Sequence, residues 1–99
     1  MPRQIIRVEL IGGASYTDYE NLHAFMEKNN WFRYIVAKLN PGEVTKKLPS
    51  ATYTGFSDNA PLNIASALTA SIRSSVWSKA AVLVMQVGEV WAIAGDDIP

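Results

Sequence analysis

The sequence predicts one small α+β domain in which two helices cover one face of a four-stranded antiparallel sheet. Three observations lead to this class. The 99 residues suffice for a single compact core and leave no room for a second domain. Stretches in which residues alternate with period two occur together with stretches of helical periodicity. The chain has no cysteine, so its stability must come from the packed core, and it suits a reducing compartment.

The first predicted strand covers residues 4–11. Its residues fall into two alternating sets, Ile6, Val8 and Leu10 on one side and Ile5, Arg7 and Glu9 on the other. The first set is apolar and the second is mixed, which is typical of a strand with one buried face. Gly12 and Gly13 end the strand. We interpret this pair as a turn rather than a phosphate-binding loop, because the longer glycine motifs are missing from the sequence.

The first predicted helix begins near Asp18 and ends at Asn29 and Asn30. Thr17 and Glu20 have the spacing of a capping box, in which two side chains satisfy backbone N–H groups at a helix start. The expected core face has helical spacing and consists of Tyr19, Leu22, Phe25 and Met26.

The middle of the chain predicts two more strands with an exposed connection between them. Residues 31–39 are rich in aromatic and β-branched side chains, which favour a strand. Residues 40–43 have the composition of a turn, and the polar stretch that follows as far as Pro49 is expected to be exposed and mobile. Residues 51–56 form the third predicted strand.

The second predicted helix follows Asp58 and Asn59, which are candidates for its N-cap, and has Pro61 in its first turn. Arg73 lies near its C-terminal end, where a cation complements the helix dipole. The helix is rich in alanine and serine. Its core face is predicted to consist of Ile64, Leu68 and Ile72.

The last predicted strand, residues 80–87, is a nearly continuous apolar run, so we expect the core to cover it well. Gly88 and Glu89 form a predicted turn, and residues 90–94 a short extra strand or arm. The order strand, helix, strand, strand, helix, strand predicts a ferredoxin-like βαββαβ sandwich. Residues 1–99 are thus expected to be a single domain, with a core at about 4–87 and a C-terminal arm at 88–99.

Nine basic residues balance nine acidic ones, and this balance argues against a dedicated duplex-DNA binder, whose affinity comes largely from lysine and arginine. Local basic patches remain compatible with zero net charge. The longest apolar stretch, residues 80–85, is far shorter than a membrane span. We therefore expect a cytoplasmic protein that binds neither duplex DNA nor a membrane.

His23 is the one candidate for acid–base catalysis, because histidine alone has an ordinary pKa near neutrality. The alternative is a histidine on the helix surface or boundary. A single histidine cannot form a histidine-based metal site, and the spacing of Asp58, Asp96 and Asp97 matches no calcium-binding loop. We expect no metal and no cofactor.

Arg7, Arg33 and Lys38 fall on predicted strands, with Tyr34 beside them. Basic and aromatic groups on an open sheet face form a platform for single-stranded RNA in some folds of this shape. The same mixed face also suits an isologous homodimer. Trp91, in the C-terminal arm, is either an anchor for a partner, or a lid over the core or a dimer contact.

Four segments together carry a family resemblance: R-V-E-L from Arg7, D-Y-E-N-L-H from Asp18, L-P-S-A-T-Y from Leu48, and residues 82–84. They resemble the GhoS endoribonuclease-antitoxin family of small bacterial and prophage proteins over most of the chain. The resemblance implies a ferredoxin-like fold similar to small CRISPR-associated nucleases, and an antitoxin that cleaves the messenger RNA of a membrane-lytic toxin. No catalytic motif transfers residue by residue. The extended 40–47 loop and the second helix depart from the family pattern.

Two functional hypotheses follow. In the first, the protein is an antitoxin-like, homodimeric RNA-binding protein, and cleavage without a metal would use His23 to take the 2′-OH proton and Arg33 to stabilise the developing charge. In the second, it is a non-enzymatic protein–protein interaction module, such as a phage- or prophage-encoded inhibitor. That module would contact its partner through the sheet face, an edge strand or the Trp91 tail.

Overall fold

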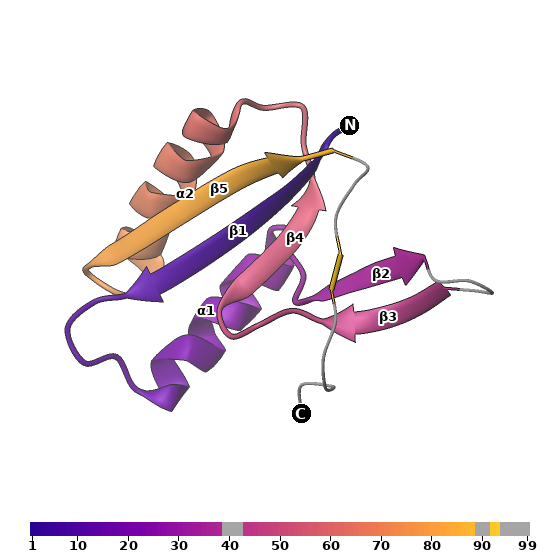
Figure 1. Cartoon of the computed structure of the whole chain (residues 1–99). Coiled ribbons are helices and arrows are strands. Elements are labelled where there is room, and N and C mark those ends of the chain that lie inside the picture. The colour runs from indigo at the N-terminus through magenta and orange to yellow at the C-terminus, as the bar shows by residue number, and fades with distance from the viewer. Residues whose placement is uncertain (39–42, 89–91, 94–99) are drawn as a thin grey trace.

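The computed structural model describes residues 1–38, 43–88 and 92–93. The chain folds into two helices and antiparallel strands, which confirms the predicted α+β class (Figure 1). The elements are β1 (Arg3–Leu10), α1 (Tyr16–Lys28), β2 (Tyr34–Lys38), β3 (Glu43–Lys47), β4 (Thr52–Phe56), α2 (Pro61–Ser75) and β5 (Ala80–Val87). No helix in the described part of the chain is long and apolar enough to cross a membrane.

The main sheet has three strands in the order β4-β1-β5, with β1 in the centre and both neighbours antiparallel to it. Both helices pack against one face of this sheet, because their buried residues belong to the same core cluster as the apolar side of β1. That cluster contains Ile6, Val8, Leu10, Leu22, Met26, Tyr53, Ile64, Leu68, Ile72 and Ala80. The predicted alternation of β1 is therefore confirmed.

The expected single four-stranded sheet is not what forms, because β2 pairs with β3 in a separate two-stranded sheet. Within the predicted strand 31–39, residues 34–38 form β2, and the pairing with the outer edge of β4 is limited to an isolated bridge at Phe32. In that bridge the backbone N of Phe32 donates to the O of Thr54 at 2.9 Å, and the N of Thr54 donates to the O of Phe32 at 2.8 Å. The chain then turns away into the β2–β3 hairpin. The architecture is compatible with a ferredoxin-like fold, with strands divided three and two.

The expectation of a mobile connection as far as Pro49 is wrong for residues 43–47, which form β3. In register, Tyr34 lies opposite Lys47 and Val36 lies opposite Thr45. This strand is stabilised by backbone pairing and offers no apolar period-two pattern, so its side chains gave no strand signal. Of the predicted 40–43 turn, residues 40–42 lie outside the described residues.

The capping box of α1 is formed two residues earlier than predicted. Ser15 is the N-cap, and its backbone N donates to Oδ2 of Asp18 at 2.7 Å while the backbone N of Asp18 donates to Oγ of Ser15 at 3.3 Å. Thr17 and Glu20 are therefore not the capping pair. Asn29 is the C-cap, as the sequence indicates, and the helix buries Leu22 and Met26 as predicted.

The second helix begins at Pro61 and buries Ile64, Leu68 and Ile72, as predicted. The predicted N-cap is wrong, because Ala60 occupies that position and makes no side-chain cap hydrogen bond. Proline at the first position explains why this start is tolerated, since its fixed φ suits a helix and it has no N–H to satisfy.

The bounds of β5 are as predicted, but the core covers the strand less than predicted. Val82 and Val84 pack against the core, whereas Leu83 is 54% exposed and Met85 also lies at the surface. The reason is that β5 is an edge strand of a sheet that has helices on one face only. Of the predicted 90–94 arm, only Ala92 and Ile93 lie within the described residues, and they form no strand.

We call the side of the main sheet opposite the helices the open face. By the strand registers it consists of Arg3, Ile5, Arg7, Glu9, Thr52, Thr54, Phe56, Ala81, Leu83, Met85 and Val87, with Phe32 bridged to Thr54. Arg7 and Glu9 are exposed here, as predicted. The guanidinium carbon of Arg3 lies 4.4 Å from the centre of the Phe56 ring, and its Nη1 donates to Oγ1 of Thr54 at 2.9 Å.

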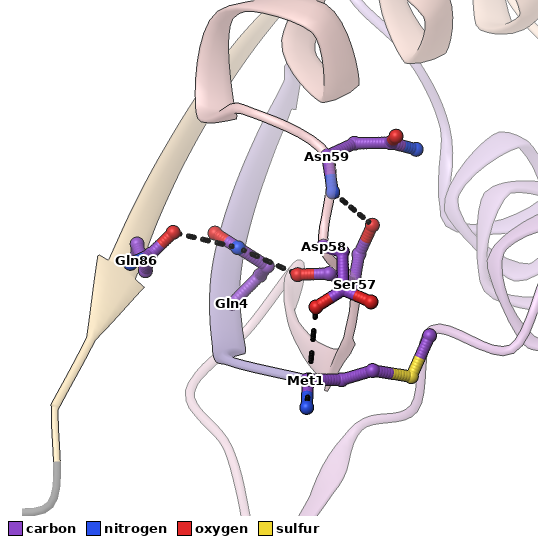
Figure 2. Close-up of polar contacts among 6 residues, drawn as sticks. All are labelled: Met1, Gln4, Ser57, Asp58, Asn59 and Gln86. Carbon is purple, nitrogen blue, oxygen red and sulfur yellow. Dashed lines mark hydrogen bonds and ion pairs between the residues drawn. The ribbon is translucent and has the colours of Figure 1, made fainter.

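Polar contacts of Gln4 join the start of β1 to the loop before α2 (Figure 2). Gln4 is fully buried, and its Nε2 lies 3.3 Å from the carbonyl oxygen of Ser57 and 3.4 Å from Oε1 of Gln86. Its own Oε1 has no partner within the described parts of the chain. The N-terminal amine lies 4.0 Å from Oδ1 of Asp58, and the backbone N of Asn59 donates to Oγ of Ser57 at 3.1 Å.

Gly55 is required where β4 meets the end of α1. A Cβ built on it would lie 2.6 Å from Cε3 of Trp31 and 2.7 Å from the carbonyl oxygen of Asn30. We expect Gly55→Ala to lower the free energy of unfolding by about 1–3 kcal/mol, because the indole and backbone must shift. Urea unfolding followed by circular dichroism measures this loss. Gly88→Ala is the control, since a Cβ at Gly88 meets nothing within 4 Å, and equal losses in both variants would contradict the explanation.

Candidate functional site

A small hollow lies where the last turns of α1 meet the start of β2. It is lined by His23, Glu27, Trp31, Phe32, Arg33 and Tyr34. Its volume of about 70 Å³ is far below the several hundred Å³ of a pocket for a drug-sized ligand. The hollow therefore suits one small charged group held at the surface, not an enclosed molecule.

The end of α1 brings these residues together. Asn30 adopts a left-handed conformation with φ of 66°, and the backbone N of Trp31 donates back to the carbonyl oxygen of Met26 at 2.9 Å. Asparagine tolerates this conformation better than most residues, which explains its place here. The reversal of the chain lays residues 31–34 beside the last turns of α1, where His23 and Glu27 lie.

His23 is hydrogen-bonded to Tyr53, with 2.6 Å between Nδ1 and Oη. Tyr53 is fully buried, and burial raises its pKa far above the usual value, so the hydroxyl keeps its proton. We assign that proton to the bond with Nδ1, because this arrangement gives the buried hydroxyl hydrogen an acceptor. The ring proton of neutral His23 then lies on Nε2, which makes Nε2 a donor.

Burial is the main reason why the pKa of His23 is lowered from its ordinary value, and the charge of Arg33 lowers it further. Glu20 opposes this shift and Lys47 adds to it. The ring is therefore neutral at pH 7. Arg33 has no ion-pair partner among the described residues, so its guanidinium is available to an anion.

Of the predicted site residues, the structure brings three together, because His23, Arg33 and Tyr34 all line the hollow. Arg7 lies apart from them, on the open face. Lys38 ends β2, and its side chain lies outside what the structure describes. Trp91 also lies outside the described residues.

Sequence reasoning missed two residues of the hollow, Phe32 and Glu27, and the contact between His23 and Tyr53. Phe32 was visible in the run W-F-R-Y but had no distinguishing spacing. Glu27 follows His23 by one helical turn, a spacing that places the two on one face of α1 and that offers the clearest missed signal. Tyr53 is 30 residues from His23 in the chain, and no local pattern predicts that contact.

The arrangement combines two kinds of group. Arg33 and Nε2 of His23 donate hydrogen bonds, as an anion such as a phosphate requires. Phe32 is 43% exposed and Tyr34 is 52% exposed, so both offer ring surface to a planar ligand. No group of three or more histidine, aspartate or glutamate side chains able to hold a metal ion occurs among the described residues.

Comparisons with family models, with curated proteins and with solved structures find no match for this chain.

The stability of the protein should depend on the protonation of His23. Its pKa is lower in the folded protein than the ordinary 6.5, so the neutral ring favours folding, and this contribution is lost as the pH falls below 6.5. Between about pH 7.5 and about pH 5.5, we expect the free energy of unfolding to fall more in the wild type than in His23→Gln. Urea unfolding at both pH values measures the difference.

Arg33→Gln serves as the second variant in this experiment. It removes one cause of the lowered pKa of His23 and leaves burial in place. We therefore expect the free energy of unfolding to fall, between the two pH values, by an amount intermediate between those of the wild type and His23→Gln. The same fall in all three proteins would contradict the assignment of a lowered pKa to His23.

Proposed function

We propose that this protein binds single-stranded RNA across the hollow and the neighbouring edge of the open face. The observation that carries the proposal is the pairing of exposed aromatic rings with cationic and donor groups in one place. Phe32 and Tyr34 supply surfaces on which bases stack, and Arg33 supplies a phosphate contact. Nε2 of His23 adds a second hydrogen-bond donor to the phosphate.

Phe32 connects the hollow to the open face, because it lines the first and is bridged to Thr54 of the second. Beyond it lies Phe56, 56% exposed, with the guanidinium of Arg3 over its ring. An RNA strand that extends from the hollow would therefore meet a second aromatic ring, that of Phe56, and a second cation, that of Arg3. Stacking on these rings needs splayed bases, which single strands offer and duplexes do not.

A ferredoxin-like fold and a relationship to the GhoS family are part of the same proposal. A bridge at the outer edge of β4 stands where a ferredoxin-like sheet has its fourth strand, next to the order β4-β1-β5. The resemblance of the sequence to the GhoS family supports an antitoxin-like role with a messenger RNA as target, which would place the protein in the cytoplasm.

Cleavage of the bound RNA would place a further demand on His23. A general base needs a free lone pair, and in the arrangement that we assign, the lone pair of Nδ1 accepts the hydrogen of Tyr53. Metal-independent cleavage would require the ring proton on Nδ1, with Tyr53 as acceptor and Nε2 as the base. The geometry thus supports binding directly, and cleavage only after a change of tautomer.

The open face favours a second candidate function, that of a protein–protein interaction module. Its exposed apolar side chains include Phe56, Leu83 and Met85, and such patches on small proteins mark interaction sites. Arg7 and Glu9, exposed on the central strand of the same face, would supply polar contacts. A phage- or prophage-encoded inhibitor would use this surface without catalysis.

We expect the wild type to bind a fluorescent single-stranded RNA of about 12 nucleotides more tightly than the duplex DNA of the same sequence. Arg33→Gln should weaken binding and reduce the slope of log K against log salt by about 0.7, because one phosphate contact is lost. Phe32→Ala should cost about 1–3 kcal/mol of binding energy through lost stacking. Fluorescence anisotropy over a salt series measures all three effects.

Arg73→Gln is the matched control, since Arg73 lies at the end of α2 and does not line the hollow. Equal losses in Arg33→Gln and Arg73→Gln would contradict a specific site, and no RNA binding at about 10 μM protein would favour the interaction module. Incubation of the RNA with the wild type and His23→Gln in a chelator tests cleavage. Products formed by the wild type alone would add catalysis to the proposed function.

A further inference from the structure

The side of the molecule formed by β5 and α2 has an unusual composition for a surface. β5 contains no charged residue and no proline over Ala80–Val87, although it is an edge strand. Edge strands are usually protected from pairing by charged residues, by proline or by a covering element. No strand in the described part of the chain pairs with the outer edge of β5. Within residues 1–38, 43–88 and 92–93, this edge thus lacks the features that keep a strand from pairing with another.

The helix behind this edge is also nearly uncharged. Arg73 is the one charged residue of α2, which packs against β5, whereas α1 has Asp18, Glu20, Glu27 and Lys28. Apart from Arg73, the exposed residues of α2 from Ser66 to Ser74 are small: Ser66, Ala67, Ala70, Ser71 and Ser74. Solvated helix faces normally carry several charged residues, so this side has less charge than is expected of a surface in water.

The backbone of β5 offers a defined set of hydrogen-bonding groups on its free side. The backbone N of Ile11 donates to the carbonyl oxygen of Lys79. Because hydrogen bonding alternates along a strand, every second residue of β1 before Ile11 also directs its N–H and C=O groups towards β5. Their partners in β5 include Leu83 and Met85. The N–H and C=O groups of the intervening residues, Val82, Val84 and Gln86, therefore point away from β1, towards the open edge.

We infer that β5 pairs antiparallel with β5 of a second copy of this chain, which joins the two main sheets into one continuous sheet. In a register centred on Val84, Val82 of one copy lies opposite Gln86 of the other, and their outward backbone groups meet. Leu83 then lies opposite Met85 on the open face, where both are exposed in the single chain. No charged residue lies opposite a like charge, because β5 contains none.

A second copy fits this edge better than an unrelated strand for two reasons. The pairing is self-complementary about a two-fold axis, so Leu83 and Met85 of each copy lie against Met85 and Leu83 of the other on the open face. The same axis brings the two α2 helices next to each other, and their small exposed residues permit a close approach. The hollow lies beside β4, at the opposite edge of the sheet, so the dimer leaves both copies of the hollow accessible.

The oligomeric state of the full chain tests this inference. We expect the wild type to sediment as a dimer of twice 10.9 kDa over about 1–100 μM. Leu83→Lys should raise the dissociation constant of the dimer at least about tenfold, because a lysine would face the apolar side chains of the second copy. Val36→Lys is the control, since Val36 is an exposed strand residue of the hairpin with a similar exposed fraction, 45%.

A second pair of variants tests the backbone contact itself. Gln86→Pro removes an N–H that points to the free edge, and Gln86→Ala removes the same side chain but keeps that N–H. Of these two variants, we expect only Gln86→Pro to be monomeric, and we expect its circular dichroism spectrum to resemble that of the wild type. Amide exchange at Val82, Val84 and Gln86 should slow with protein concentration in the wild type and stay fast in Leu83→Lys.

Three results would overturn the inference. The first is a wild type that stays monomeric throughout the concentration range. The second is a dimer that persists in both Leu83→Lys and Gln86→Pro, which would place the interface elsewhere. The third is slow exchange of these amides in the monomer, which would mean that another segment of the same chain covers the edge. RNA binding by a monomeric variant would leave the proposed function intact.

Discussion

Burial of one face of β1 is the constraint on which the rest of the structure depends. β1 is the central strand, and its Ile6, Val8 and Leu10 lie in the core with residues from both helices and both neighbouring strands. Because successive side chains of a strand point to opposite faces, the burial of this set commits Arg7 and Glu9 to the other face. One core then suffices for the domain, and the second face of the sheet stays uncovered by helices.

The uncovered face and the two strand edges differ in chemistry, and this difference organises the surface. On the β4 side, the Phe32–Thr54 bridge and the turn after α1 gather aromatic and cationic groups around His23. On the β5 side, charged residues are almost missing from both the strand and the helix behind it. A ligand that carries phosphates suits the first edge, and an apolar strand suits the second. The two proposals thus concern opposite edges of one sheet.

Zero net charge conceals this distribution. Nine basic and nine acidic residues suggest a surface without preference for any charged ligand. In the folded protein, however, Arg33 lines the hollow without an ion-pair partner among the described residues, and its charge with that of Lys47 outweighs Glu20 in the effect on the pKa of His23. Local arrangement, rather than the total, therefore decides the charge that a ligand would meet at the hollow.

The sequence by itself determined the elements whose signals are local. Alternation in residues 4–11 predicted β1, and helical spacing predicted the buried residues of both helices. Only the tertiary structure decided that residues 43–47 pair with β2, that β5 is an exposed edge, and that Tyr53 reaches His23. These features depend on backbone pairing and on contacts between residues far apart in the chain. Side-chain periodicity carries no information about either, because it reports only which face of one element is apolar.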